Sequence, residues 1–266
     1  MGASVDLYNT SYGNYGTDLY RDVRIATYGE DFGQTSWVTT EESHEIPPLL
    51  NLTETSVVIE IGSGSGRYAL HLAETIRCRV IGLDVNAEGV RNANALAAER
   101  HLTSCAEFRQ ADVSEPLPFA AASIDAVFSN DAFCHVPARL ALLHECARVL
   151  KPAGRLLFSD ALIVGGILSN DEVAIRTSIG RYFLVPPSEN ERLIDAAGLR
   201  LIEARDTTEE AAALALRWYD ARNARRDALI AVEGQSNFDG LQKFLISVHT
   251  LTREKRLRRA VYLARK

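Results

Sequence analysis

A glycine-rich turn that directly follows an apolar run constrains this chain more than any other segment. Residues 57–67 read Val-Val-Ile-Glu-Ile-Gly-Ser-Gly-Ser-Gly-Arg. The apolar run predicts a short buried strand, and Gly62, Gly64 and Gly66 let the backbone approach a ligand that any Cβ would block. A helix predicted over 68–75 offers unpaired N–H groups at its start. This strand–turn–helix unit predicts a binding site for a ligand with polar atoms.

Apolar runs and helical patterns alternate along most of the remaining chain. Strands are predicted at 57–61, 80–85, 106–112, 124–130, 155–160, 199–207 and 257–263. Helices are predicted between them at 68–75, 87–100, 137–150 and 188–197. This alternation predicts parallel βαβ units with helices on both faces of the sheet. Because such crossovers are right-handed almost without exception, we expect an α/β fold with an open, doubly wound sheet.

The segments outside this alternation predict a helical cap. Residues 1–50, with helical stretches near 17–27 and 39–50, are expected to form an N-terminal helical lid or cap segment, and 51–266 the core. Two interruptions of the core are expected. These are a lid connection at 161–187, which contains Gly-Gly and Pro-Pro pairs, and inserted cap helices over 208–252, with patterns at 208–233 and 237–252.

The acidic residues near the glycine turn indicate which nucleoside the site takes. Asp84 ends the second predicted strand about 18 residues beyond the turn, where a carboxylate can accept both ribose hydroxyls. Dinucleotide folds use G-x-G-x-x-G/A, but here Arg67 stands where the third small residue is expected. Glu60, just before the glycines, would repel a pyrophosphate and suits a cationic group. The residues therefore predict a positively charged nucleoside ligand.

Composition excludes several other classes of protein. The chain of 266 residues carries 29 Lys and Arg against 35 Asp and Glu, a net charge of −6 that disfavours a nucleic-acid partner. The four cysteines form no Cys-x-x-Cys pair, so we expect no metal site. No apolar run reaches the length of a membrane-spanning helix and the first residues lack a secretory pattern, so we expect no membrane partner and a cytoplasmic location.

Residues 57–160 resemble the class I S-adenosylmethionine-dependent methyltransferases of the small-molecule type. Five ordered segments carry the resemblance: Glu60-Ile-Gly-Ser-Gly-Ser-Gly66, Val80-Ile-Gly-Leu-Asp84, Ala111-Asp-Val113, Ile124-Asp-Ala-Val-Phe-Ser-Asn-Asp131 and Arg148-Val-Leu-Lys-Pro-Ala-Gly-Arg-Leu156. The resemblance implies a Rossmann-like sheet of seven strands in the order 3-2-1-4-5-7-6, with the last strand antiparallel. It also implies S-adenosyl-L-methionine as the cofactor and S-adenosyl-L-homocysteine as its product.

The same resemblance implies a set of cofactor-binding residues. They are Glu60, Gly62, Ser63, Gly64, Gly66, Asp84, Val85, Asn86, Asp112, Val113 and Asn130. Glu60 and the glycine turn are implied near the methionine part, and Asp84 on the ribose. Asp112 with Val113 is implied at the adenine, and Asn130 beside the methionyl group.

A finer resemblance extends to both flanks of the core. Asn130-Asp-Ala-Phe-Cys-His135 is similar to the Gln-Asp-Ala-Phe-x-His run of glycine, sarcosine and dimethylglycine N-methyltransferases. Tyr28-Gly-Glu-Asp-Phe-Gly33 is similar to the segment that covers the cofactor in that group. Bacterial natural-product methyltransferases share these features. We therefore expect a small-molecule methyl acceptor in secondary or specialised metabolism, with nitrogen, oxygen and carbon all open as the methylated atom.

Three residues are candidates for catalysis. His135 follows the fourth predicted strand and, with an ordinary pKa near 6.5, could take a proton from an amine, phenol or hydroxyl. Asp131 could orient His135, hold a cationic substrate, or cap the turn at 131–135. Tyr28 could pack its ring against the sulfonium or be a core aromatic of the cap.

Some alternatives stay open at this level. A nicotinamide-dependent oxidoreductase shares the glycine turn and the acid of the second strand, and a non-catalytic cofactor-binding partner subunit would keep the same turn. The Tyr-rich N-terminus is compatible with contacts in a homo-oligomer. The basic run 253–259 is expected along an edge strand, where charges discourage pairing with other chains.

Overall fold

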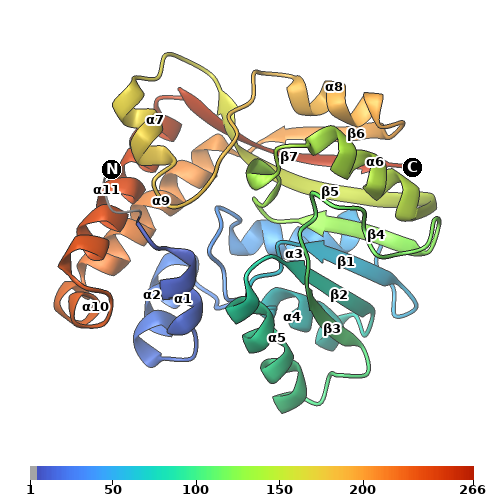
Figure 1. Ribbon diagram of the computed structural model, residues 1–266, viewed down its shortest axis with the longest axis horizontal. Coiled ribbons are helices and arrows are strands. Elements are labelled where there is room, and N and C mark those ends of the chain that lie inside the picture. Colours follow the sequence, from blue (N-terminus) through green and yellow to red (C-terminus); the bar gives the residue numbers. More distant parts are fainter. Residues whose placement is uncertain (1–4) are drawn as a thin grey trace.

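Seven strands form one sheet in the computed structural model, which describes residues 5–266 (Figure 1). They are β1 (Val57–Ile61), β2 (Arg79–Asp84), β3 (Ala106–Gln110), β4 (Ile124–Ser129), β5 (Leu150–Val164), β6 (Arg200–Asp206) and β7 (Leu257–Arg265). Their order is β3-β2-β1-β4-β5-β7-β6, and β7 runs antiparallel to both of its neighbours. The predicted doubly wound sheet and its strand order are confirmed.

Helices cover both faces of this sheet. They are α1 (Tyr8–Gly13), α2 (Asp18–Tyr28), α3 (Thr40–Leu49), α4 (Arg67–Thr75), α5 (Ala87–Glu99), a 3₁₀ helix (Phe133–His135), α6 (Arg139–Val149), α7 (Asn170–Arg176), α8 (Glu189–Ala196), α9 (Thr208–Asn223), α10 (Arg226–Glu233) and α11 (Gln235–Arg253). Ile59 and Ile61 of β1 belong to the cluster that includes side chains of α6 and α8. Val58 belongs to the opposite cluster, with side chains of α3, α4 and α5. Successive strand residues point to opposite faces, so β1, which is covered on both sides, is apolar except at Glu60.

Helices from the two ends of the chain pack into a common layer beside the sheet, where α2 lies against α9 and α11 against α9 and α10 (Figure 1). Their apolar cluster includes Val23, Trp37, Trp218 and Phe244. The helical pattern predicted over 208–233 is divided into α9 and α10. The predicted lid connection contains the end of β5 and α7. The assignment of these segments as lid and cap stays a prediction.

The basic run 253–259 does not lie along an edge strand, and that prediction is wrong. The edges of the sheet are β3 and β6, and β7 lies between β5 and β6. The reason is that β7, which follows α11, pairs with both β5 and β6 and is therefore an interior strand of the sheet. Arg258 pairs with Asp206 on β6 at 2.7 Å, and Arg259 is only 1% exposed.

Two features are absent from residues 5–266. No helix there is long and apolar enough to cross a membrane. The same residues contain no group of three His, Cys, Asp or Glu side chains placed to hold a metal ion.

Candidate active site

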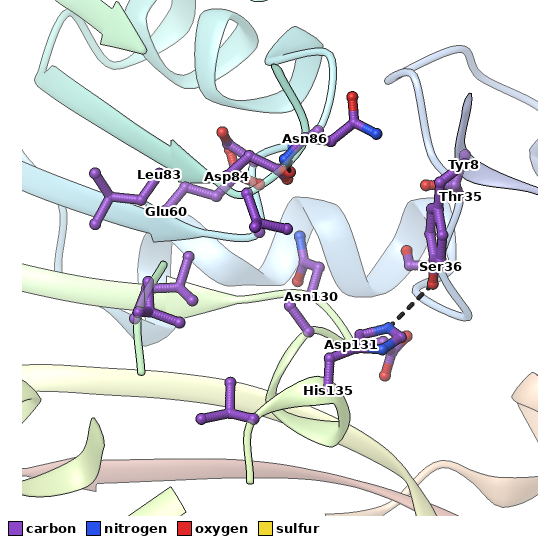
Figure 2. Close-up of a pocket in the computed structure, with 18 of the residues that line it drawn as sticks. Tyr8, Thr35, Ser36, Glu60, Leu83, Asp84, Asn86, Asn130, Asp131 and His135 are labelled. Atoms are coloured by element: carbon purple, nitrogen blue, oxygen red, sulfur yellow. Dashed lines mark hydrogen bonds between the residues drawn. The ribbon is translucent and has the colours of Figure 1, made fainter. Parts of the chain in front are cut away.

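A cavity of about 460 Å³ opens at the carboxyl ends of β1, β2 and β4 (Figure 2). The strand order reverses between β1 and β4, which is the point where open α/β sheets bind their ligands. The predicted residues that line it are Glu60, Gly62, Ser63, Gly64, Asp84, Val85, Asn86, Asp112, Val113, Asn130, Asp131 and His135. The loop before α3, including Gln34, Thr35, Ser36 and Val38, forms another part of the wall.

The three glycines of the turn are needed for two different reasons. All have positive φ, with values of 75° at Gly62, 52° at Gly64 and 74° at Gly66. A Cβ on Gly62 would lie 2.4 Å from the Cβ of Ala132, which follows β4 and also lines the cavity. Gly66 does not line the cavity; a Cβ there would lie 2.6 Å from the Phe108 ring of β3. The first two glycines therefore shape the cavity, and the third lets α4 pack on the sheet.

Two carboxyl groups stand next to the turn, on one side of the cavity (Figure 2). Glu60 is 4% exposed, and its Oε2 has no hydrogen-bond partner among the described residues. Burial, with a smaller contribution from Asp84, raises the pKa of Glu60 well above its usual range. Burial also raises the pKa of Asp84, against the opposing hydrogen bonds that it accepts at 2.7 Å from the N–H groups of Asn86 and Gly64. A buried carboxylate without a partner is stabilised by a cation, so this end fits a positively charged ligand.

The wall beyond β2 combines apolar and polar groups. Val85 is 69% exposed, although it lines the cavity next to Asp84. Asn86 caps α5, and its Nδ2 donates to Asn9 Oδ1 of α1 at 2.9 Å. Asp112 Oδ1 accepts a hydrogen bond from the N–H of Ser114 at 2.9 Å. An exposed apolar side chain flanked by acceptors suits a flat heterocyclic base.

His135 lies on the other side of the cavity, where Figure 2 shows its bond to Tyr8, and both of its ring nitrogens are hydrogen-bonded. Nδ1 is 2.7 Å from the carbonyl oxygen of Arg181, so Nδ1 carries the proton and donates it. Burial lowers the pKa of His135, against the opposing hydrogen bond to Arg181, so the ring is neutral at pH 7. Nε2 then accepts a hydrogen bond from the Tyr8 hydroxyl at 3.0 Å. The ring therefore directs a basic lone pair toward a hydroxyl that lines the cavity.

Two tyrosines extend this hydrogen-bonded chain. The Tyr8 hydroxyl is 3.1 Å from that of Tyr182. Burial raises the pKa of Tyr8 well above its usual range and that of Tyr182 to about 12. Both hydroxyls are therefore neutral and can pass a proton without holding a charge. Tyr8 was missed by sequence reasoning; the Tyr-rich N-terminus was the available signal, but no spacing connected it to the fourth strand.

Asp131 lines the cavity but does not take its predicted role beside His135. Its Oδ1 is 3.0 Å from Arg259 Nε, and its Oδ2 accepts the N–H of Trp37 at 2.8 Å. The 3₁₀ turn that follows has no side-chain cap. Asp131 therefore neither orients the histidine nor caps the turn, because an arginine that was expected on an edge strand occupies it.

Tyr28 was predicted to pack its ring against the sulfonium, but it does not line the cavity. Its hydroxyl donates to the carbonyl oxygen of Ser36 at 2.8 Å, and its ring centroid is 6.0 Å from that of Trp218. The side chain is a core aromatic of the cap, the other position considered for it, and it supports the wall from behind.

Comparisons with known proteins agree with this geometry. Residues 59–158 match the family described as a methyltransferase domain. The 27-O-demethylrifamycin SV methyltransferase of Amycolatopsis mediterranei is 27% identical over 206 residues, which cover 73% of this chain and 75% of that protein. The glycine/sarcosine/dimethylglycine N-methyltransferase of Actinopolyspora halophila is 26% identical over 191 residues, which cover 71% of this chain and 33% of that protein.

A solved structure extends the likeness of fold over almost the whole chain. Phosphoethanolamine N-methyltransferase 2 of Haemonchus contortus, in complex with phosphomonomethylethanolamine and S-adenosylhomocysteine, has a TM-score of 0.81 at 19% identity. The match covers 97% of this chain and 60% of that one. The likeness therefore includes the cap helices as well as the sheet.

Residues 59–158 carry a methyltransferase domain and the chain is similar to small-molecule methyltransferases, so the protein is an S-adenosylmethionine-dependent methyltransferase. Its cofactor is S-adenosylmethionine, and the nicotinamide-dependent and non-catalytic alternatives are set aside. The residues present fit this cofactor. Glu60 Oε2, buried and without a hydrogen-bond partner among residues 5–266, meets the need of a cationic ligand, and Gly62 lets the turn pass close to Ala132 at the cavity wall.

Proposed function

We propose that this enzyme methylates a nitrogen, oxygen or carbon nucleophile of a small molecule that binds beside His135, in secondary or specialised metabolism. The observation that carries the proposal is the neutral His135, whose Nε2 faces the cavity-lining Tyr8 hydroxyl at 3.0 Å. The metabolic context rests on similarity to a rifamycin methyltransferase.

We assign cofactor binding to the predicted residues at the acidic end of the cavity. Glu60 and the glycine turn would hold the methionyl part, because Glu60 Oε2 is buried and has no hydrogen-bond partner in residues 5–266. Asp84 would accept the ribose hydroxyls with the lone pairs that its backbone bonds leave free. Val85, Asp112 and Val113 would enclose the adenine, with Asn86 at its edge. Asn130, at the end of β4, would lie beside the methionyl group.

The bound cofactor supplies a methyl group on a sulfonium, and this chain supplies alignment of the acceptor and a place for its proton. Holding reacting groups in line contributes roughly 7–11 kcal/mol, whereas a positioned base contributes about 10²–10⁴-fold in rate. Alignment by the cavity walls is therefore the larger effect. In the proposed proton step, the acceptor's proton passes to the Tyr8 oxygen as the Tyr8 proton passes to His135 Nε2. Tyr8 stays neutral, and the ring becomes a cation.

A labelling experiment tests the proposal. The protein would be incubated with methyl-labelled S-adenosylmethionine and a panel of small amines, phenols, hydroxyacids and carbon acids, and co-crystallised with S-adenosylhomocysteine. We expect label in at least one small acceptor, and the sulfur of the bound product facing His135 across the cavity. Label only in macromolecules, or a sulfur directed away from His135, would contradict the proposal.

A further inference from the structure

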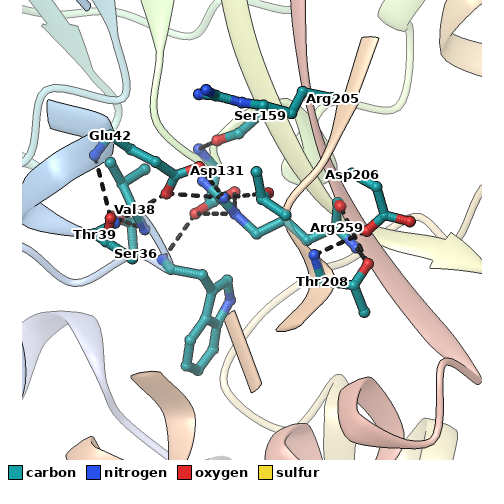
Figure 3. Close-up of polar contacts among 12 residues, drawn as sticks. Ser36, Val38, Thr39, Glu42, Asp131, Ser159, Arg205, Asp206, Thr208 and Arg259 are labelled. Carbon is teal, nitrogen blue, oxygen red and sulfur yellow. Dashed lines mark hydrogen bonds and ion pairs between the residues drawn. The ribbon is translucent and has the colours of Figure 1, made fainter. Parts of the chain in front are cut away.

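A buried cluster of one arginine and two carboxylates joins three distant parts of the chain beneath the cavity wall (Figure 3). Arg259 of β7 bonds through Nε to Asp131 Oδ1 at 3.0 Å and through Nη1 to Glu42 Oε1 at 2.8 Å. Nη1 also donates to Thr207 Oγ1 at 2.7 Å. The arginine is 1% exposed, and the two acids are 8% and 9% exposed. Water therefore contributes little, and the groups depend on one another.

Both carboxylates also hold the backbone of the segment that leads into α3. Asp131 Oδ2 accepts the N–H of Trp37 at 2.8 Å, and Glu42 Oε2 accepts the N–H of Thr39 at 3.0 Å. Ser36 and Val38, the neighbours of Trp37, line the cavity. The position of this wall therefore depends on where the two carboxylates are held.

Arginine suits this task better than lysine. Its planar group offers several N–H donors in fixed directions, so one side chain can hold two carboxylates and a hydroxyl at once. Asp131 has a φ of 56°, in a region that residues other than glycine seldom adopt. Its bonds to Arg259 and Trp37 hold that conformation. The neighbouring Asn130, which lines the cavity, is fixed by the same backbone.

We propose that Arg259 is a positioning residue for methyl transfer, which fixes the cavity wall at 36–39 and the end of β4 through Glu42 and Asp131. The inference rests on the proposed location of the cofactor and acceptor in this cavity. Arg259 itself does not line the cavity. Its effect on the reaction is therefore indirect and passes through the wall.

The test compares Arg259→Lys with Arg222→Lys. Arg222 pairs with Glu233 in the cap, at 3% and 0% side-chain exposure, and does not line the cavity. Arg222→Lys therefore weakens an equally buried ion pair away from the cavity. Both variants should unfold at a lower temperature than wild type. For Arg259→Lys alone we expect the Kd of S-adenosylhomocysteine by calorimetry, and the KM of S-adenosylmethionine, to rise roughly 2- to 30-fold with kcat little changed.

Amide hydrogen exchange, measured below the unfolding temperature, gives a second test. If Arg259 only contributed to overall stability, its replacement would not change the exchange rates of the cavity wall selectively. We expect the amides of Trp37 and Thr39 to exchange faster in Arg259→Lys than in wild type, and at the wild-type rate in Arg222→Lys. Should Arg259→Lys fail to fold, Glu42→Gln replaces it, with a smaller change expected in the same direction.

The outcomes separate this inference from the proposed function. If wild type binds S-adenosylhomocysteine while Arg259→Lys, or Glu42→Gln in its place, keeps the wild-type Kd and exchange rates, the positioning role is wrong. If wild type itself does not bind S-adenosylhomocysteine, the proposed location of the cofactor is wrong, and the inference fails with it.

Discussion

The two ends of the cavity are built from the sequence in different ways. The proposed cofactor end uses short segments at strand ends: the turn 62–66, the pair Asp84 and Val85, and residues 111–113. The proposed acceptor end brings together Tyr8 and His135, which lie 127 positions apart. One end follows from local backbone geometry, whereas the other exists only once the N-terminal helices have packed.

Their electrostatics differ in the same way. The cofactor end holds two carboxyl groups, Glu60 and Asp84, whose pKa values burial raises. The acceptor end holds a neutral imidazole and a neutral hydroxyl in one hydrogen-bonded chain. The first arrangement favours a cation, and the second favours a neutral group that must lose a proton. Because the two ends share few residues, mutations at one should leave the task of the other intact.

The largest effect is expected from His135→Ala. Loss of the base should lower kcat by ~10²–10³, while the Kd of S-adenosylhomocysteine, measured by calorimetry, stays close to that of wild type. His249→Ala is a matched control, because its Nδ1 also bonds a backbone carbonyl, that of Ala212 at 2.8 Å, and His249 does not line the cavity. A loss of product affinity in His135→Ala would show that the two ends are not separate.

A smaller effect is expected from Asp84→Ala, which should weaken the binding of S-adenosylhomocysteine. Losing charged hydrogen bonds to the ligand should cost about 1.5–3 kcal/mol, or roughly 10- to 150-fold in the Kd of S-adenosylhomocysteine. Asp125→Ala is the control. Asp125 accepts the N–H of Val57 at 2.8 Å and pairs with Lys151, but at the amino end of β4. Product binding as tight as in wild type would remove Asp84 from the cofactor site.

The same difference between the two ends explains what could be read from the sequence. The buried strands and the glycine turn were predictable, because apolar runs and positive φ act over a few residues, whereas the strand order was implied only by the resemblance to a known family. The helix break between Asn223 and Arg226 was not predictable, since helical patterning continues through it. Local signals thus indicated most of the predicted residues that line this end of the cavity.

Long-range packing explains the residues that were missed or misplaced. Arg259 was expected at an edge, yet β7 enters between β5 and β6 and brings its guanidinium to Asp131. That contact in turn removes Asp131 from His135, a change that no spacing in the chain could reveal. Tyr8 reaches the histidine only because α1 packs beside α5, against the core.

The smallest effect is expected from Tyr8→Phe, and it has a pH signature. His135 must be neutral to accept a proton, and burial lowers its pKa, so kcat/KM should rise from the acid side and level off with a midpoint below about 6.5. The Tyr8 hydroxyl donates to Nε2 and so stabilises the neutral ring. Removing it should raise the pKa of His135 and move the acid limb to higher pH. It should lower kcat by only roughly 2- to 10-fold, the value of one hydrogen bond, because the acceptor can then donate its proton directly to the Nε2 that the hydroxyl leaves free.

Tyr12→Phe is the matched control for this last effect. Tyr12 is also a buried tyrosine of α1 that lines the cavity, but it lies against Gly64 at the cofactor end and does not bond His135. Its loss should leave the acid limb in place. If the two variants shifted the limb equally, the hydroxyl of Tyr8 would have no specific coupling to the base. The acceptor's proton would then reach His135 directly, without a relay through α1.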